Sequence, residues 1–240
     1  MELKVTDISK KFRNKKALDG FSCTFTEGIN ILLGPNGAGK STLMNSIADA
    51  IKIDSGNIDY DGDNIYKMGR NFRKILGYLP QNPEFYPFFK GREIIDYFAT
   101  LKGLKKNEYN TDELMAAVNL SDAIDRKCGG YSGGMRRRLG IAVTMLGNPK
   151  VMIFDEPTAG LDPKERLTFK DNLKQLAKDR IVIMATHIIS DAEDIGTKMV
   201  LINNGKKLTE GSMEELIKDT ETKTGRSGIS LDDVYMQWFG

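Results

Sequence analysis

The stretch GPNGAGKST, residues 34–42, follows the apolar run at 29–33 and fits the pattern Gly-x-x-x-x-Gly-Lys-Ser. In such a loop the glycines let backbone N–H groups converge on phosphate oxygens, the lysine reaches the outer phosphates, and the serine hydroxyl binds magnesium. A helix that begins near Thr42 adds the positive end of its dipole. Because a strand precedes the loop and a helix follows it, the stretch favours a phosphate-binding loop over a tight glycine-rich turn.

The composition limits the partners that this chain can attract. Its 240 residues include 35 Lys plus Arg and 33 Asp plus Glu, a formal net charge of +2, which gives no bulk attraction to nucleic acid or acidic lipid. Cys23 and Cys128 form no Cys-x-x-Cys pair, which fits a reduced compartment. The N-terminus lacks the apolar core of a signal peptide, and no apolar run approaches the roughly 18 residues of a membrane span. We expect a chain that is soluble and cytoplasmic by itself.

Hydrophobic periodicity predicts an α/β fold. Residues 3–8, 21–26 and 29–33 are expected strands of one mixed sheet, with a turn at Glu27-Gly28. Apolar residues at spacings of three and four predict a helical insertion over 85–146. Two β-branched runs at 151–154 and 181–185, separated by a charged helical segment, indicate a β-α-β unit with buried parallel strands. Residues 220–230 are expected to be a polar connector before a C-terminal helix.

The stretch VMIFDE, residues 151–156, is an apolar strand that ends in two carboxylates. A magnesium nucleotide needs one acidic residue in the metal shell and another near the attacking water. Asp155 fits the first role and Glu156 the second. The alternative is a pair of solvated charges at the end of a strand.

The stretch YSGGMRRR, residues 131–138, places small residues before an amphipathic run. Ser132, Gly133 and Gly134 at a helix start expose backbone N–H groups to an anion, although an ordinary serine N-cap explains the same pattern. The three arginines at 136–138 are interpreted as a solvated helix face, with contact to a partner or a phosphate as the alternative.

These stretches, in this order, resemble the nucleotide-binding domain of an ABC-type ATPase over nearly the whole chain. The match makes residues 34–42 the Walker A motif, YSGGM the signature, VMIFDE the Walker B motif and AGLD the D-loop. It implies one domain over 1–240, with an α/β P-loop NTPase (RecA-like) core and antiparallel β subdomain over 1–84 and 147–219. The helical subdomain over 85–146 would carry the signature, and 220–240 would be the connector and C-terminal helix.

The resemblance also implies the site. Two such domains pair head to tail, with ATP between the Walker A of one and the signature of the other. Ser41, Gln81 and Asp155 would serve Mg²⁺, Glu156 would polarise the attacking water, and His187 would contact the γ-phosphate. Ser132, Gly133 and Gly134 would act on the partner's ATP, and Asp162 in the D-loop would couple the two sites. The implied nucleotide-binding residues are Phe12, Gly34, Asn36, Gly37, Ala38, Gly39, Lys40, Ser41, Thr42 and Gln81.

The form YSGGM followed by RRRLGIA resembles the ATPase subunits of bacterial exporters for drugs, antimicrobial peptides, lipids or polysaccharides. It predicts a motor that hydrolyses ATP to drive separate transmembrane permease subunits and sits on the inner face of the cell membrane through them. Tyr131 and Met135 stand where the common signature has Leu and Gln, so the hydrogen bond that the family credits to that glutamine is not carried over to this chain. Phe12 can stack on adenine but lacks a phenol, so we expect weak selection between ATP and GTP.

Three further interpretations stay open. The aromatic stretch EFYPFFKG, residues 84–91, is either core of the helical lobe or a docking patch in which Phe85 and Phe88 receive a permease helix. A soluble ABC ATPase that acts on nucleic acid or the ribosome is the alternative function. The short span from Lys40 to Ser132 and the single phosphate loop disfavour it. A binding module without hydrolysis is disfavoured by Glu156 and His187.

Overall fold

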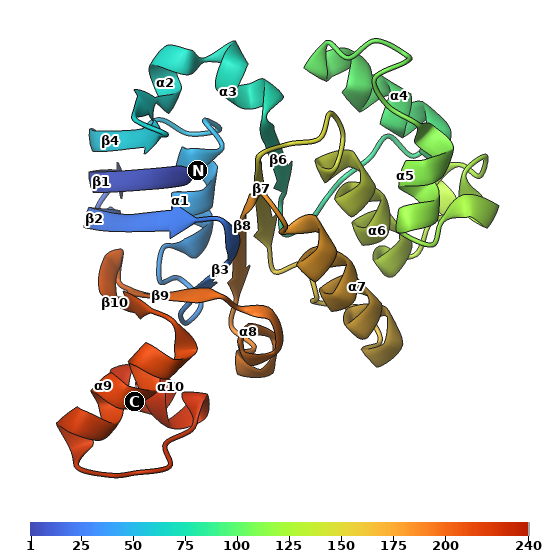
Figure 1. Cartoon of the computed structure of the whole chain (residues 1–240). Coiled ribbons are helices and arrows are strands. Elements are labelled where there is room, and N and C mark those ends of the chain that lie inside the picture. Colours follow the sequence, from blue (N-terminus) through green and yellow to red (C-terminus); the bar gives the residue numbers. More distant parts are fainter. Residues whose placement is uncertain (240) are drawn as a thin grey trace.

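The computed structural model describes residues 1–239 and contains two sheets that lie side by side (Figure 1). The first sheet is antiparallel with strand order β2-β1-β4-β5, and the second has the order β10-β9-β3-β8-β7-β6. In the second sheet β9, β3, β8, β7 and β6 run parallel and β10 pairs antiparallel at the edge. The strands are β1 (Glu2–Phe12), β2 (Lys15–Thr26), β3 (Gly28–Leu33), β4 (Ser55–Tyr60), β5 (Asp63–Asn64), β6 (Leu76–Leu79), β7 (Val151–Asp155), β8 (Ile181–Thr186), β9 (Lys198–Asn203) and β10 (Lys206–Gly211).

The third expected strand does not share a sheet with the first two, which corrects the prediction of one mixed sheet at the start of the chain. β3 instead lies between β8 and β9 in the parallel sheet. Its residues from Ile29 onward are buried on both faces, as in central parallel strands. Gly28, with φ of +101°, lies at the point where the chain passes from one sheet to the other.

Helices cover both faces of the parallel sheet. Helix α1 lies between the two sheets, α7 and α8 pack on the opposite face, and α4 to α6 gather beyond β6 (Figure 1). The helices are α1 (Lys40–Ile47), α2 (Ile65–Met68), α3 (Arg70–Lys74), α4 (Gly91–Lys102), α5 (Thr111–Ala117), α6 (Gly133–Thr144), α7 (Pro163–Leu176), α8 (Ile189–Ile195), α9 (Met213–Thr224) and α10 (Leu231–Phe239). Short 3₁₀ turns at Ser121–Ala123 and Cys128–Gly130 connect α5 to α6.

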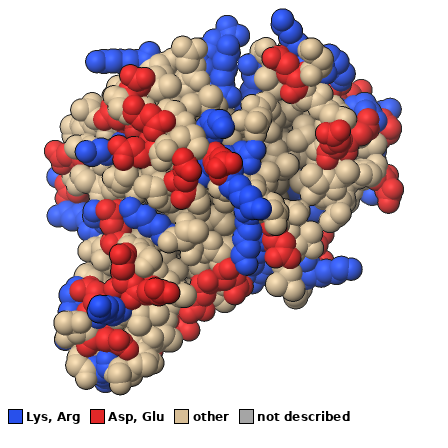
Figure 2. Space-filling model, in the orientation of Figure 1, with Lys and Arg blue, Asp and Glu red and all other residues tan. Residues whose placement is uncertain are grey.

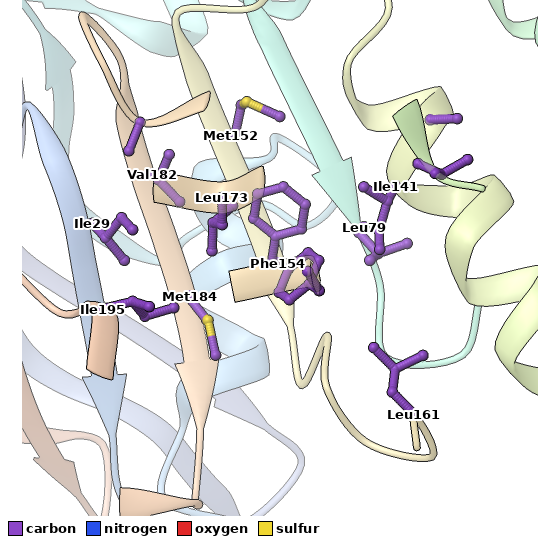
Figure 3. Close-up of a cluster of buried hydrophobic side chains, with 14 of the residues drawn as sticks. Ile29, Leu79, Ile141, Met152, Phe154, Leu161, Leu173, Val182, Met184 and Ile195 are labelled. Atoms are coloured by element: carbon purple, nitrogen blue, oxygen red, sulfur yellow. The ribbon is translucent and has the colours of Figure 1, made fainter. Parts of the chain in front are cut away.

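Two hydrophobic clusters lie on either side of the parallel sheet. Successive residues of β7 alternate between them: Met152 and Phe154 join the cluster under α7 and α8, while Val151 and Ile153 join the cluster around α1. Figure 3 shows this first cluster continuing from Phe154 through Leu79 on β6 to Ile141 on α6. Helix α6 is therefore packed directly against the sheet that carries Asp155.

The C-terminal segment is more helical than its polar composition indicated. Helix α9 takes in Thr220–Thr224, part of the expected connector, because Ser212 and Glu215 form a capping box at its start and Gly225, with φ of +67°, ends it. Among residues 1–239, none of the helices combines the length and the apolar character that a membrane span requires. Blue and red atoms alternate across the face drawn in Figure 2, in line with the balanced net charge.

Candidate active site

The predicted phosphate loop connects the carboxyl end of β3 to α1. Gly37 and Gly39 have φ of +82° and +113°, conformations that other residues rarely adopt. A Cβ on Gly34 would lie 2.2 Å from the carbonyl oxygen of Ile202, so the loop needs glycine there for space. Gly39 is the N-cap of α1 and supplies no side chain to bond the first amides of the helix. The loop thus presents backbone N–H groups and the positive end of a helix dipole.

The loop borders a cleft of about 470 Å³. Phe12, at the end of β1, is half exposed on its rim, and the ammonium of Lys10 lies 5.4 Å from its ring centroid. Lys15 and Ala17 of β2 also line the cleft, although no sequence motif predicts them. The predicted residues that line it are Phe12, Asn36, Gly37, Ala38, Gly39, Lys40, Ser41, Thr42, Gln81, Asp155 and Glu156.

Lys40 is buried at the floor of this cleft. Its Nζ donates to the carbonyl oxygens of Gly34 at 2.6 Å and Pro35 at 3.2 Å, and lies 3.9 Å from Oε1 of Glu156. Burial lowers the pKa of Lys40, an effect that the Glu156 and Asp155 carboxylates oppose. The ammonium is therefore held at the cleft by a carboxylate and two carbonyls, ready to contact an added phosphate.

Asp155 and Glu156 lie at the carboxyl end of β7 and are only 3% and 4% exposed. Burial raises the pKa of Asp155, the Ser41 hydroxyl lowers it, and the Glu156 charge raises it again. A cation beside Asp155 would offset this desolvation. Ser41, Gln81 and Asp155 share the cleft and offer hydroxyl, amide and carboxylate oxygens, the hard donors that Mg²⁺ prefers.

Within residues 1–239 no group of three or more His, Cys, Asp or Glu side chains could hold a metal ion. A binding mode with one or two protein ligands plus substrate phosphates is typical of Mg²⁺ at nucleotide sites. The donor set of Ser41, Gln81 and Asp155 therefore fits an ion that enters together with a nucleotide.

Glu156 is bound to His187, the single histidine of the chain. Nδ1 of His187 lies 3.0 and 2.9 Å from the two carboxylate oxygens of Glu156. The two residues meet because β7 and β8 are parallel neighbours that pair Asp155 with Ala185, so both side chains follow at the same sheet edge. The His187 side chain is 49% exposed while Glu156 is buried. His187 is not among the residues that line the cleft, and its link to the cleft is the contact with Glu156.

The predicted signature and D-loop residues lie apart from this cleft. Ser132 is the N-cap of α6, and its Oγ accepts a hydrogen bond from the N–H of Met135 at 3.1 Å. Gly133 is exposed beside it. Asp162 is the N-cap of α7 and accepts from the N–H of Glu165 at 2.8 Å. None of these residues lines the cleft that holds the phosphate loop.

The interpretation of the three arginines at 136–138 as one solvated helix face is wrong, because they lie in three different environments. Arg136 is exposed, Arg138 is half-buried and pairs with Glu165 at 3.1 Å, and Arg137 is buried. The guanidinium of Arg137 donates to the backbone carbonyls of Glu156 and Gln81. Burial lowers the pKa of Arg137, and the charges of Glu156 and Asp155 oppose that effect.

Comparison with known proteins decides the family. A model of the ABC transporter family matches residues 18–159, more than half of the chain. The chain belongs to this family.

Relatives and solved structures agree with this assignment. The ABC transporter ATP-binding protein YxlF of Bacillus subtilis, itself uncharacterised, is 35% identical over 223 residues, covering 92% of this chain and 74% of that protein. The Nod factor export ATP-binding protein I of Burkholderia thailandensis is 34% identical over 215 residues, covering 88% and 71%. A solved ATP-binding subunit of an ABC transporter superposes with a TM-score of 0.90 at 24% identity, covering all of both chains. The expected fold, with a P-loop NTPase core, an antiparallel sheet and a helical part, is confirmed, and the chain is an ATP-hydrolysing subunit of the ABC transporter type.

Proposed function

We propose that this ABC subunit hydrolyses ATP between two head-to-tail copies of such domains and drives a separate transmembrane permease, on the inner face of the cell membrane. The observation that carries the proposal is the separation of the two phosphate-binding elements. The loop at 34–42 opens on one cleft, whereas the exposed start of α6 at Ser132 and Gly133 lies outside it. An exposed helix start suits the phosphates of a nucleotide held by a second chain.

Within one site, the residues take the following roles. The loop amides and Lys40 hold the phosphates, and Phe12 stacks on the base. Ser41, Gln81 and Asp155 would hold Mg²⁺, which when bound would neutralise charge on the phosphates. Glu156 accepts a proton from the attacking water, and His187 keeps the Glu156 carboxylate oriented through Nδ1 at 2.9 Å.

The direction of transport that we propose is export. The name of the Nod factor export relative supports this choice, and so does the YSGGM sequence of the signature. We further propose that 85–146 forms the unit that carries the signature, because α4, α5 and α6 pack on one another beyond the edge strand β6.

The contact with the permease is proposed at an aromatic patch made of Tyr86, Phe88, Phe89 and Tyr97. These rings contact one another with centroids 5.2 to 6.1 Å apart. Phe88 is 61% exposed and Tyr86 50%, so the patch offers a large apolar surface that an amphipathic permease helix can cover. Phe85 packs edge to face on Phe98 at 6.2 Å and belongs more to the core, which leaves Phe88 as the main anchor.

Replacing Glu156 tests whether this residue is the general base of ATP hydrolysis. Glu156→Gln keeps the size of the side chain but removes the proton acceptor, so the ATP turnover rate should fall by roughly 100 to 10,000-fold. The dissociation constant for ADP should stay within about twofold, because Lys40 and the loop amides are untouched. Unchanged turnover would show that Glu156 is not the base.

A further inference from the structure

Arg137 contacts the active site of its own chain from the signature helix. It lies on α6, five positions after Ser132, and is only 8% exposed. Nη2 donates to the carbonyl oxygen of Gln81 at 2.6 Å, and Nη1 donates to the carbonyl oxygen of Glu156. One guanidinium thus joins α6 to a proposed magnesium ligand and to the proposed base.

The Glu156 backbone has a conformation that needs support. Its φ is +51°, in the left-handed region that non-glycine residues rarely adopt. Its N–H donates to the carbonyl oxygen of Ala185 on β8 at 3.0 Å, while its carbonyl accepts from Arg137. The backbone of Glu156 is therefore held by β8 at its N–H and by α6 at its carbonyl, and the direction of the Glu156 side chain depends on both contacts.

We propose that Arg137 is a positioning residue that fixes the Glu156 backbone and Gln81 relative to the signature helix of the same chain. This inference rests on the proposed head-to-tail dimer. The start of α6 contacts the ATP of the partner, so a movement of α6 on closure reaches Glu156 and Gln81 of its own site through one rigid guanidinium. Arg137 thereby links the closing of one ATP site to the catalytic geometry of the other.

Planar donor geometry explains why arginine serves here. A guanidinium presents several N–H donors in a fixed fork and can hold two carbonyls at once, whereas a lysine ammonium is a compact donor on a flexible stem. Loss of the fork should let Glu156 shift by a fraction of an ångström to about 1 Å, and a displacement of that size costs up to about 100-fold in rate. In the described part of the chain Arg137 forms no hydrogen bond to the phosphate loop, so nucleotide binding should be spared.

The test compares Arg137→Gln and Arg137→Lys with Arg138→Gln in the full chain. Arg138 is the matched control, because it is the next arginine of α6 and bonds to Glu165 and the carbonyl of Asn119 instead. We expect Arg137→Gln to lower kcat by 10 to 100-fold while the ADP dissociation constant stays near the wild type. The Tm should fall by roughly 2–10 °C, because two carbonyls lose a buried donor. Arg137→Lys should be intermediate, and Arg138→Gln should keep a rate within about threefold.

A second readout separates positioning from a merely structural role. With Glu156 intact, Arg137→Gln should accumulate as an ATP-bound dimer in light scattering, because it closes on ATP but hydrolyses it slowly. Three results would overturn the inference. The first is a kcat of Arg137→Gln within twofold of the wild type, and the second is an equal loss of kcat in Arg138→Gln. The third is a double variant Arg137→Gln/Glu156→Gln that stays monomeric under conditions in which Glu156→Gln alone dimerises. If Glu156→Gln alone stays monomeric, the dimer itself is wrong, whereas the kcat comparison still tests the positioning of Glu156 within one chain.

Discussion

Gly39→Ala is the sharpest perturbation of the phosphate loop. At φ of +113° an alanine is strained, and its Cβ would lie 2.6 Å from the carbonyl oxygen of Ala17 in β2. Backbone on a strand cannot rotate away, so the loop must move by roughly 0.5 to 1 Å, and the conformation alone costs about 1–3 kcal/mol. The loop is also tied to the β9–β10 turn by the N–H of Gly205, which donates to the carbonyl of Ala38 at 2.8 Å.

The effect on nucleotide affinity follows from the amides that the shift misaligns. A hydrogen bond to a charged phosphate contributes about 1.5–3 kcal/mol, so two misaligned amides cost about 3 kcal/mol or more. We therefore expect the dissociation constant for ADP-Mg to rise at least about 100-fold. Calorimetric titration with ADP avoids hydrolysis, and far-ultraviolet circular dichroism shows that the variant is folded.

Gly133→Ala is the matched control for this experiment. A Cβ at Gly133 meets nothing within 4 Å, and the residue lies outside the cleft. Its ADP affinity should stay within about twofold of the wild type. The reasoning fails if Gly39→Ala binds ADP as tightly as the wild type, or if both variants weaken equally.

Two further predictions concern stability and docking. Burial lowers the pKa of Lys102 to about 8, against about 10.4 in an unfolded chain. Between these two pH values the unfolded state binds more protons than the folded state. The contribution of Lys102 to the free energy of unfolding therefore rises with pH in this range. The pKa shift corresponds to about 3 kcal/mol, but methionine also loses the hydrogen bond from Lys102 Nζ to the carbonyl of Leu146. Lys102→Met should therefore exceed the wild type by about 1–2 kcal/mol in the free energy of unfolding at pH 7, and the gain should vanish near pH 10. Urea titrations of Lys102→Met and of the exposed Lys105→Met measure the free energy of unfolding of each variant. An equal gain in stability in both variants would refute the prediction. Phe88→Ala should abolish co-purification with the permease, while Leu167→Ala, equally exposed at 61% on α7, should not. Retained assembly and transport-coupled ATPase in Phe88→Ala would exclude the patch.

Local patterns predicted the site better than they predicted the sheets. The phosphate loop and the two carboxylates at the end of β7 are contiguous motifs, and each motif specifies its own backbone. The membership of β3 in the second sheet depends on pairing with β8 and β9, more than 140 positions away along the chain, which no local pattern contains. Lys15 pairs with Phe12 at the turn between β1 and β2, and it lines the cleft because this turn lies beside the phosphate loop, which no local pattern contains.

Arg137 is a different case, because the sequence held a signal for it. Gly140, Ile141 and Thr144 lie three, four and seven positions further along α6 and are buried with it on one face. The run of three arginines indicated a single exposed face, but consecutive residues of a helix point in different directions, so only Arg137 shares the buried face. The buried arginine is stable because two backbone carbonyls and nearby carboxylates satisfy its charge.

The most direct test of the proposed dimer is the mass of Glu156→Gln in solution. The variant is passed over a size-exclusion column with light scattering, with ATP-Mg, with ADP-Mg and without nucleotide. The account predicts a monomer of about 27 kDa without nucleotide and with ADP, and a dimer of twice that mass with ATP alone. Adding Ser132→Arg, which fills the exposed start of α6, should restore the monomer. A Glu156→Gln chain that binds ATP and remains monomeric would contradict the head-to-tail sandwich as a property of this chain.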